Sequence, residues 1–277
     1  MKQEKALELQ KHARDIRIET VRAIGKVGVG HLGGSLSIAD ILAVLYNYEM
    51  NIDPGQPDLP GRDRLILSKG HAGPALYAAL ALKGYFPVEK LQTLNQMGTD
   101  LPSHCDMTKT PGVDMTTGSL GQGLSCAVGM AMAARIVGGN EWIYVIIGDG
   151  ESQEGQIWEA SMSASHYKLE NLIVFMDYNN LQLDGTTDEI MSLRDPVERW
   201  KSFGFNATEV NGHDVQKIAD TIAHMKCLRN GKPTMIVLHT IKGKGVSFIE
   251  KPTGSNHNMP ISQEQVINAI RELEVVC

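Results

Sequence analysis

Two continuous apolar stretches, each ending in a short polar turn, constrain the fold more than any other feature of the chain. WIYVII runs into Gly148-Asp149-Gly150, and NLIVFMDY runs into Asn179-Asn180. Apolar runs of this length bounded by turn residues are typical of buried strands. The stretch between them, EGQIWEASMSASHYKL, is predicted to be a helix. Two buried strands joined through a helix indicate a parallel sheet.

The same alternation continues along the rest of the chain. Two more strands are predicted, at RLILS (64–68) and TMIVLHTI (234–241). Further helices are predicted over 4–27, 38–50, 71–85, 87–97, 123–139, 197–204, 215–229 and 261–274, and loops over 53–63 and 95–118. This order predicts an α/β fold with three layers, in which helices cover both faces of a mainly parallel sheet. No repeat or linker interrupts it, so residues 1–277 are predicted to form a single domain.

Charge and composition argue against several classes of protein. A formal net charge of −6 is poorly suited to a nucleic-acid or anionic membrane surface. No run of about 18 apolar residues is present to span a membrane, and the charged N-terminus lacks the apolar segment of a signal peptide. We therefore expect a cytoplasmic protein. Reduced thiols, and no zinc site, are expected because the cysteines are scattered: Cys105, Cys126, Cys227 and Cys277.

The stretch GVGHLGG (28–34) has the Gly-x-Gly-x-x-Gly spacing of a dinucleotide-binding loop. Such a loop follows a buried strand and opens a helix, so that backbone N–H groups face the pyrophosphate. Here the glycines follow the helix predicted over 4–27, and the next segment is again helical instead of a strand ending in an acid. An NAD site is therefore not expected. The glycines are predicted to bring the backbone and His31 to a cleft.

The two polar turns are predicted to form a metal and phosphate site. Asp149 and Asn179 are thirty positions apart, so both should emerge at the same edge of the sheet. A carboxylate and an amide oxygen suit Mg²⁺ or Ca²⁺ held together with phosphates. Gly148 and Gly150 let the backbone approach an anion, and the helix that begins near Glu154 directs free N–H groups towards it. An isolated Gly-Asp-Gly could be an ordinary turn, but the second turn at this interval favours a diphosphate bridged by a metal.

Gly-Asp-Gly followed about thirty residues later by Asn-Asn resembles the motif of thiamine diphosphate enzymes. Within that superfamily, nearly the whole chain resembles the N-terminal half of transketolase. The motifs that carry this resemblance are GHLGGSLSIADIL (30–42), SKGHAGPALYAAL (68–80), TTGSLGQGLSCAVGMA (116–131), GDGESQEGQIWEA (148–160), DYNNLQLDG (177–185) and HTIKGKG (239–245). A full transketolase is about twice as long. The chain therefore resembles the N-terminal subunit of a split transketolase.

The resemblance implies roles for individual residues. Asp149, Asn179 and the backbone carbonyl of Leu181 match the metal ligands of the family. Positions that match the thiamine diphosphate site are His71, Gly118, Leu120, Asp149, Gly150, Asn179 and Lys242. Matches to the catalytic histidines, which contact sugar hydroxyls and the developing oxyanion, are His31, His104 and His257. The surroundings of His104, LPSHCDM, depart from the usual Gly-His-Pro, which leaves its position open.

The resemblance also implies a reaction and a partner. Transketolases move a two-carbon ketol unit from a ketose (phosphate) to an aldose (phosphate), and thiamine diphosphate supplies the chemistry. The glutamate that activates the cofactor, and the main sugar-phosphate arginines, belong to the pyrimidine-binding half, and the chain has no motif for them. A separate C-terminal subunit is therefore expected, in an α2β2 heterotetramer. Glu154 and Glu159 match acids at that interface.

Two other interpretations remain open from the sequence. The α subunit of a 2-oxo acid dehydrogenase also carries Gly-Asp-Gly and Asn-Asn, and also needs a second chain. A non-catalytic cofactor-binding subunit would keep the same turns. The histidine motifs GHLGG and SKGHA favour transketolase over the first, and the four histidines found in motifs argue against the second. Deoxyxylulose-phosphate synthase, another relative, is usually a long single chain.

Overall fold

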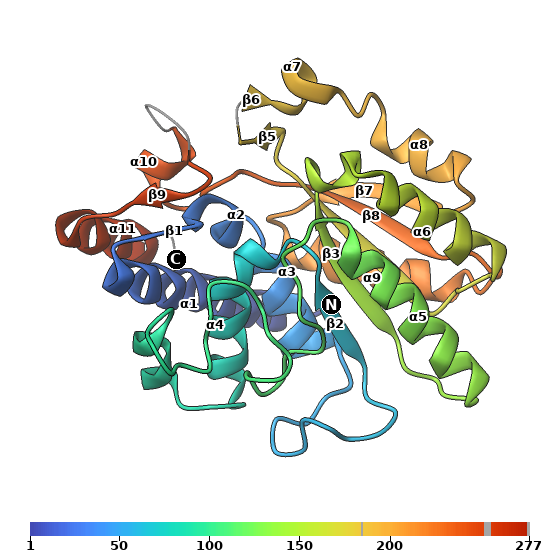
Figure 1. The fold of residues 1–277 in the computed structure, drawn as a ribbon, viewed down its shortest axis with the longest axis horizontal. Coiled ribbons are helices and arrows are strands. Elements are labelled where there is room, and N and C mark those ends of the chain that lie inside the picture. The colour runs from blue at the N-terminus through green and yellow to red at the C-terminus, as the bar shows by residue number, and fades with distance from the viewer. Residues whose placement is uncertain (184, 252–255, 276–277) are drawn as a thin grey trace.

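The computed structural model describes residues 1–183, 185–251 and 256–275 (Figure 1). Asp184 of the DYNNLQLDG motif, residues 253–255 before His257, and Cys277 lie outside the described residues. Cys105, Cys126 and Cys227 are free thiols. No helix in the described part of the chain combines the length and apolar character needed to cross a membrane.

A parallel five-stranded sheet forms the centre of the structure. Its strands, in spatial order, are β2 (Arg64–Leu67), β3 (Ile143–Gly148), β4 (Leu172–Tyr178), β8 (Thr234–His239) and β7 (Asn206–Asn211). The four strands predicted from apolar runs are confirmed. The fifth, β7, is absent from the sequence prediction because this edge strand has the polar sequence NATEVN and buries only Val210.

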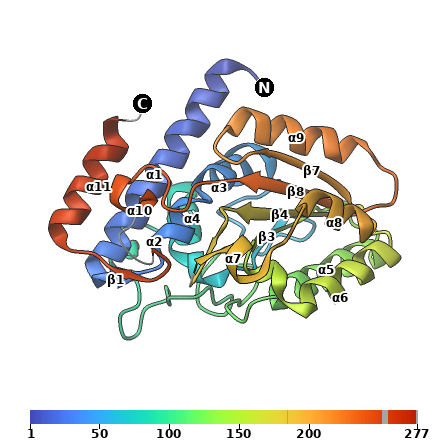
Figure 2. The same cartoon turned by 90° about the horizontal axis from the view of Figure 1, so that it is seen from above.

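Helices cover both faces of the sheet, which confirms the predicted three-layer arrangement (Figure 2). The first layer contains α1 (Gln3–Val27), α3 (Ala39–Val44), α4 (Gly73–Lys83), α9 (Val215–Cys227) and α11 (Gln263–Val275), which packs against α1. The second layer contains α5 (Gln122–Ile136), α6 (Gly155–His166) and α8 (Pro196–Ser202).

The strands divide their side chains between two separate cores. In β4, Ile173 and Phe175 join the core under the first layer, whereas Leu172, Val174 and Met176 join the core under the second. Strands β3 and β8 divide their apolar side chains in the same way. Because both faces are buried, most positions along these strands are apolar, and the sequence shows a continuous run instead of an alternating one.

Short elements account for most differences from the sequence predictions. The helix predicted over 87–97 is only a 3₁₀ helix, Val88–Thr93, and the helix predicted over 38–50 divides into α3 and a π-helical turn, Leu45–Glu49. Other short helices are α2 (Leu32–Leu36), α7 (Thr187–Met191), α10 (Ser247–Glu250) and the 3₁₀ helices Gly70–Ala72 and Glu151–Gln153. Strand β1 (Val29–Gly30) pairs with β9 (Met259–Pro260), and β5 (Leu181–Gln182) pairs with β6 (Gly185–Thr186). These segments are too short to show a hydrophobic period.

The parallel sheet gathers the loops that carry the predicted site residues. The carboxyl ends of β2, β3, β4 and β8 lie along one edge, because neighbouring strands are parallel and in register, with Gly148 opposite Asp177 and Tyr178 opposite His239. The loops that begin at 68, 149, 179 and 240 therefore start side by side. This edge is where ligands bind in open parallel sheets.

Two glycines of α5 provide a test of the packing between this helix and the sheet. A Cβ added to Gly123 would lie 2.4 Å from Ser68 Oγ and 2.8 Å from Ser68 Cα, whereas one added to Gly129 would meet nothing within 4 Å. We expect Gly123→Ala to lower the free energy of unfolding by about 1–3 kcal/mol through overpacking. Gly129→Ala, the matched control, should raise it by about 0.5–1 kcal/mol through helix propensity. Urea unfolding followed by circular dichroism measures both, and equal effects of the two substitutions would contradict the close contact.

Candidate active site

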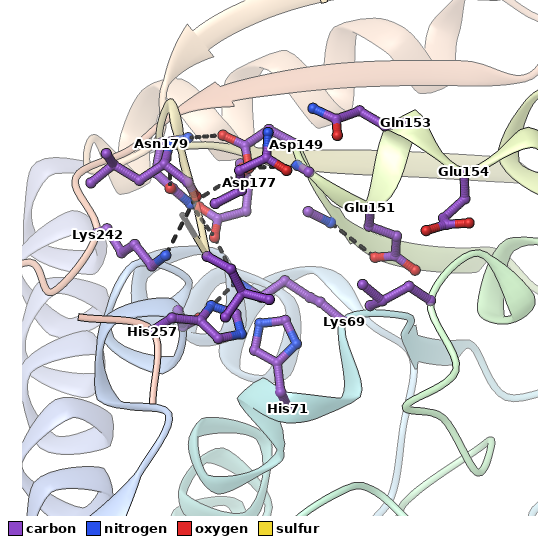
Figure 3. A pocket seen from close by; sticks show the side chains of 17 residues that line it. Lys69, His71, Asp149, Glu151, Gln153, Glu154, Asp177, Asn179, Lys242 and His257 are labelled. Atoms are coloured by element: carbon purple, nitrogen blue, oxygen red, sulfur yellow. Dashed lines mark hydrogen bonds and ion pairs between the residues drawn. The ribbon is translucent and has the colours of Figure 1, made fainter. Parts of the chain in front are cut away.

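A cavity of about 280 Å³ opens at the carboxyl edge of the sheet (Figure 3). Most of the residues predicted from sequence line it: His71, Leu120, Asp149, Gly150, Glu154, Asn179, Leu181, Lys242 and His257. Figure 3 shows Lys242 and His257 on one side of the cavity, and Glu151 and Glu154 on the other. Leu120 is 39% exposed, so it belongs to the cavity wall and not to the hydrophobic core.

Asp149 lies beside Asn179, as the strand ends predicted. Asp149 Oδ2 accepts hydrogen bonds from the backbone N–H groups of Asn179 (3.0 Å) and Asn180 (2.7 Å). Its Oδ1 accepts from the N–H of Gly150 at 2.8 Å, so this N–H already has a partner within the turn. Burial, reinforced by the negative charge of Asp177, raises the pKa of Asp149 to about 6. A buried carboxylate in this state is stabilised in its charged form by a bound cation.

The oxygen atoms around Asp149 fit a hard divalent cation. Asn179 offers its side-chain oxygen, which here accepts from the N–H of Leu181 at 3.1 Å. The carbonyl of Leu181 faces Lys242, whose Nζ donates to it at 3.4 Å. A carboxylate, an amide oxygen and a backbone carbonyl are the ligand types that Mg²⁺ and Ca²⁺ prefer.

A buried ion pair, which sequence analysis missed, lies under these oxygens. Lys69 Nζ donates to Asp177 Oδ2 at 2.6 Å and to the carbonyl of Gly34 at 2.7 Å, and the Lys69 and Asp177 side chains are only 2% and 0% exposed. Asp177 also accepts hydrogen bonds from Ser37, Thr240 and Asn179. Although burial opposes ionisation, Lys69 and these donors hold the pKa of Asp177 below its ordinary value. The hydrogen bond from Asn179 to Asp177 thus fixes the side chain of Asn179.

The sequence did contain a signal for this pair. Asp177 stands inside the apolar strand NLIVFMDY, and Lys69 follows the apolar strand RLILS almost directly. A charge within a buried strand requires a partner of opposite charge, because an isolated buried ion is very costly.

Glu151 is a second functional candidate that sequence analysis missed. It is 3% exposed, and its carboxylate accepts hydrogen bonds from Ser68 Oγ, from the N–H of Gly121 (2.9 Å) and from the N–H of Gly148 (3.0 Å). Burial raises its pKa, and these donors oppose the rise. Glu151 therefore ties the loop after β2 and the loop before α5 to the turn that carries Asp149.

Four histidines from four distant motifs meet beside the cavity. The ring centroid of His31 lies 5.2 Å from that of His71, 5.9 Å from that of His104 and 5.1 Å from that of His257, and His71 lies 4.8 Å from His257. His104 is thus placed in the cluster despite its atypical surroundings. Burial, followed by the charge of Lys69, lowers the pKa of His71 far below its usual range, and burial and Lys242 lower that of His257 to about 4. Burial also lowers the pKa of His31, so these three imidazoles are neutral at pH 7.

Glycines allow the loops to approach one another around this cluster. Gly118 has φ 140°, and a Cβ on it would lie 2.9 Å from Cδ2 of His104. Gly34, from the GHLGG motif, lines the cavity, and its Cβ would lie 3.3 Å from both Lys69 Nζ and His71 Nε2. The glycines of that motif follow a helix, α1, and Gly34 brings the backbone against the charged Lys69 and the neutral His71.

The two remaining acids lie on or next to α6. Glu154 is the residue before the helix and borders the cavity, whereas Glu159 lies on an exposed part of α6 and does not line it. Within the described residues neither forms an ion pair. The helix begins at Gly155, as predicted to within one residue, and a 3₁₀ turn separates it from Asp149.

Because Lys69 and Asp177 form a buried ion pair, substitution of Lys69 should strongly lower the free energy of unfolding. Lys69→Met leaves a buried carboxylate without its cation, so we expect a loss of about 3–5 kcal/mol in the free energy of unfolding. Lys90→Met is the matched control, because Lys90 pairs with Asp100 at the surface, and it should change stability by about 1 kcal/mol or less. Chemical unfolding measures both. A Lys69→Met protein as stable as the wild type would show that the pair does not hold these loops.

The raised pKa of Asp149 predicts how the free energy of unfolding depends on pH when no cation is bound. Its folded-state pKa, about 6, lies above the ordinary value of 3.8. Asp149 therefore contributes stability that is fully present below about pH 4 and is lost as pH rises through 6, a loss of about 2–3 kcal/mol. Asp149→Asn should remove this component. The free energy of unfolding of both proteins is measured from pH 4 to 7 with a chelator present. As pH rises, the stability of the variant should increase relative to that of the wild type. A difference in stability that stays constant with pH would contradict the raised pKa.

Comparisons with known proteins agree with this geometry. The family model described as transketolase, thiamine diphosphate binding domain, matches residues 9–274. The chain is 55% identical over 271 residues to the 6-deoxy-6-sulfo-D-fructose transketolase subunit of Clostridium sp. (strain MSTE9), covering 98% of each chain. It is 41% identical over 271 residues to one subunit of the apulose-4-phosphate transketolase of Phocaeicola vulgatus, covering 98% of this chain and 95% of that protein.

Solved structures of transketolases are also similar to this chain. The transketolase from Leishmania mexicana superposes with a TM-score of 0.90 at 33% identity, over 96% of this chain and 41% of that one. The chain thus spans about two fifths of this transketolase, and nearly the whole of the relatives named as subunits. From the family match, the identities and the fold, we conclude that the chain belongs to the transketolase family and corresponds to its thiamine diphosphate binding domain.

Proposed function

We propose that the chain is the cofactor-binding subunit of a split transketolase, which transfers a two-carbon ketol unit from a ketose (phosphate) to an aldose (phosphate). The observation that carries this proposal is that Asp149 and Asn179 line one cavity with His71 and His257, and that His31 and His104 cluster with these two histidines. Relatives of similar length are named as transketolase subunits, which supports the split organisation. The histidine cluster favours ketol transfer over the role of a non-catalytic cofactor-binding subunit.

The residues present fit thiamine diphosphate and a divalent cation. Asp149, Asn179 and the carbonyl of Leu181 would hold Mg²⁺ or Ca²⁺, and Lys242 and His71 would face the diphosphate. Burial and the charge of Lys69 lower the pKa of Lys242 to about 8, a shift that an anion beside it would oppose. When bound, thiamine diphosphate supplies the carbanion chemistry of the ketol transfer.

The histidines would act on the sugar. His257 lines the cavity with His71, and His31 and His104 lie beside them, where an imidazole can donate a hydrogen bond to a hydroxyl or pass a proton. Because burial keeps His31 and His257 neutral, they can bind sugar oxygens without adding charge beside Lys242. Gly118 would keep the loop of His104 against the others.

We infer that a second chain completes the site. The chain spans 41% of the Leishmania transketolase, and the relatives that match its length are called subunits. Leu120 and Glu154 are exposed at the cavity, and Glu159 is exposed on α6, where that chain would contact it. An α2β2 heterotetramer in the cytoplasm is the proposed assembly.

The names of the relatives suggest which donor to test first. The relative that is 55% identical is named for 6-deoxy-6-sulfo-D-fructose, and the one that is 41% identical for apulose 4-phosphate. We propose 6-deoxy-6-sulfo-D-fructose as the donor, because the higher identity favours it. Fructose 6-phosphate and apulose 4-phosphate are the comparison substrates.

The split organisation predicts that activity depends on complementation. The purified chain, supplied with thiamine diphosphate and Mg²⁺, should not transfer ketol units, because the groups that activate the cofactor are expected on the other half. Co-purification with the pyrimidine-binding subunit should produce transfer to an aldose phosphate, measured by mass spectrometry of the products. Transfer by the chain alone would disprove the need for a partner. An assembled complex that is inactive with all three donors, or active only with 2-oxo acids, would disprove the proposed reaction.

A further inference from the structure

The side-chain amide of Gln182 has a buried nitrogen without a hydrogen-bond partner. Buried side-chain atoms that lack a partner among the described residues belong to Arg62, Glu141, Asn171, Gln182 and Trp200. Of these, only Gln182 lines the cavity that holds Asp149 and Asn179. An unsatisfied buried amide is costly, and such groups in native proteins call for an explanation. A ligand that enters this cavity could supply the missing acceptor.

The backbone holds Gln182 against the turn that carries Asp149. Gln182 ends β5, where it pairs with Gly185 of β6. A Cβ added to Gly150 would lie 3.2 Å from Gln182 Cβ and 3.5 Å from its Oε1. The oxygen end of the amide therefore lies beside Gly150, and a larger residue at Gly150 would crowd it.

The charges around Gln182 favour an anionic ligand. Lys242 donates to the carbonyl of Leu181, the residue before Gln182, and it forms no ion pair within the described residues. The other lysine of the cavity, Lys69, is already neutralised by Asp177. An ammonium group without a counter-ion and an amide without an acceptor thus lie on neighbouring parts of one wall. A ligand with several negatively charged oxygens satisfies both.

We propose that Gln182 donates a hydrogen bond from Nε2 to the diphosphate of the bound cofactor. This inference rests on the proposed function, since it names a further residue for the same site. Gln182 adds a neutral donor from β5 to a site in which the N–H of Gly150 is already engaged by Asp149. It binds the diphosphate without displacing the oxygens proposed to hold the metal.

Three variants test the proposal in the full chain assembled with its complementary subunit. Gln182→Met keeps the length of the side chain and removes the donor, and Gln182→Glu replaces the donor with a negative charge. Gln153→Met is the matched control, because Gln153 lines the same cavity but its amide already donates to the carbonyl of Met191 at 2.9 Å. Isothermal titration calorimetry gives Kd for thiamine diphosphate and for inorganic pyrophosphate, each with Mg²⁺.

We expect Gln182→Met to raise Kd roughly tenfold or more for both ligands, because a hydrogen bond to a charged group is lost. Gln182→Glu should raise Kd further through repulsion, and Gln153→Met should change it about twofold or less. Without ligand, the thermal unfolding temperature of Gln182→Met should equal or exceed that of the wild type, because an unpaired buried amide has been replaced by an apolar group.

Several results would overturn the proposal. An unchanged Kd in Gln182→Met, or a change for thiamine diphosphate but not for pyrophosphate, would exclude a contact with the diphosphate. Tighter binding by Gln182→Glu would place the side chain on the metal instead. A lower unfolding temperature of ligand-free Gln182→Met would show a structural role. If the wild-type complex bound neither ligand, the proposed function itself would fail, a result that is distinct from wild-type binding unaffected by the variants.

Discussion

The ion pair between Lys69 and Asp177 is the interaction on which the rest of the site depends. It joins the loop after β2 to the end of β4, and the same two groups bind the carbonyl of Gly34 and the side chain of Asn179. Neither group can remain charged in this position without the other, since both are almost completely buried. The metal-ligand candidate Asn179 and the GHLGG segment are therefore positioned by one electrostatic contact.

The parallel sheet explains why so much of this arrangement could be predicted from sequence. Apolar runs located β2, β3, β4 and β8, and the polarity of parallel strands then required Asp149 and Asn179 to meet at one edge. The contacts between the histidines could not be predicted in this way. Their positions in the sequence do not imply contact, so His31 and His257 could be brought together only by resemblance to a known family.

The parts that could not be predicted depend on contacts that leave no periodic signal. Strand β7 is polar because it lies at the sheet edge, and the hairpin of β5 and β6 is only two residues long on each side. Glu151 looks like an ordinary turn acid in the sequence, and only the fold shows its three hydrogen-bond donors. The unpaired amide of Gln182 is likewise a property of packing, which no motif records.

The division of the hydrophobic interior into two cores has a consequence for cooperativity. The sheet separates them, and the segments at its carboxyl edge connect to both: α2, which contains Gly34, belongs to the first layer, whereas Gly121 and Glu151 precede helices of the second. A ligand held by all of these loops binds only when both layers are folded, so its binding energy is shared between them. Occupancy of the cavity would thus stabilise both layers of the domain together against unfolding.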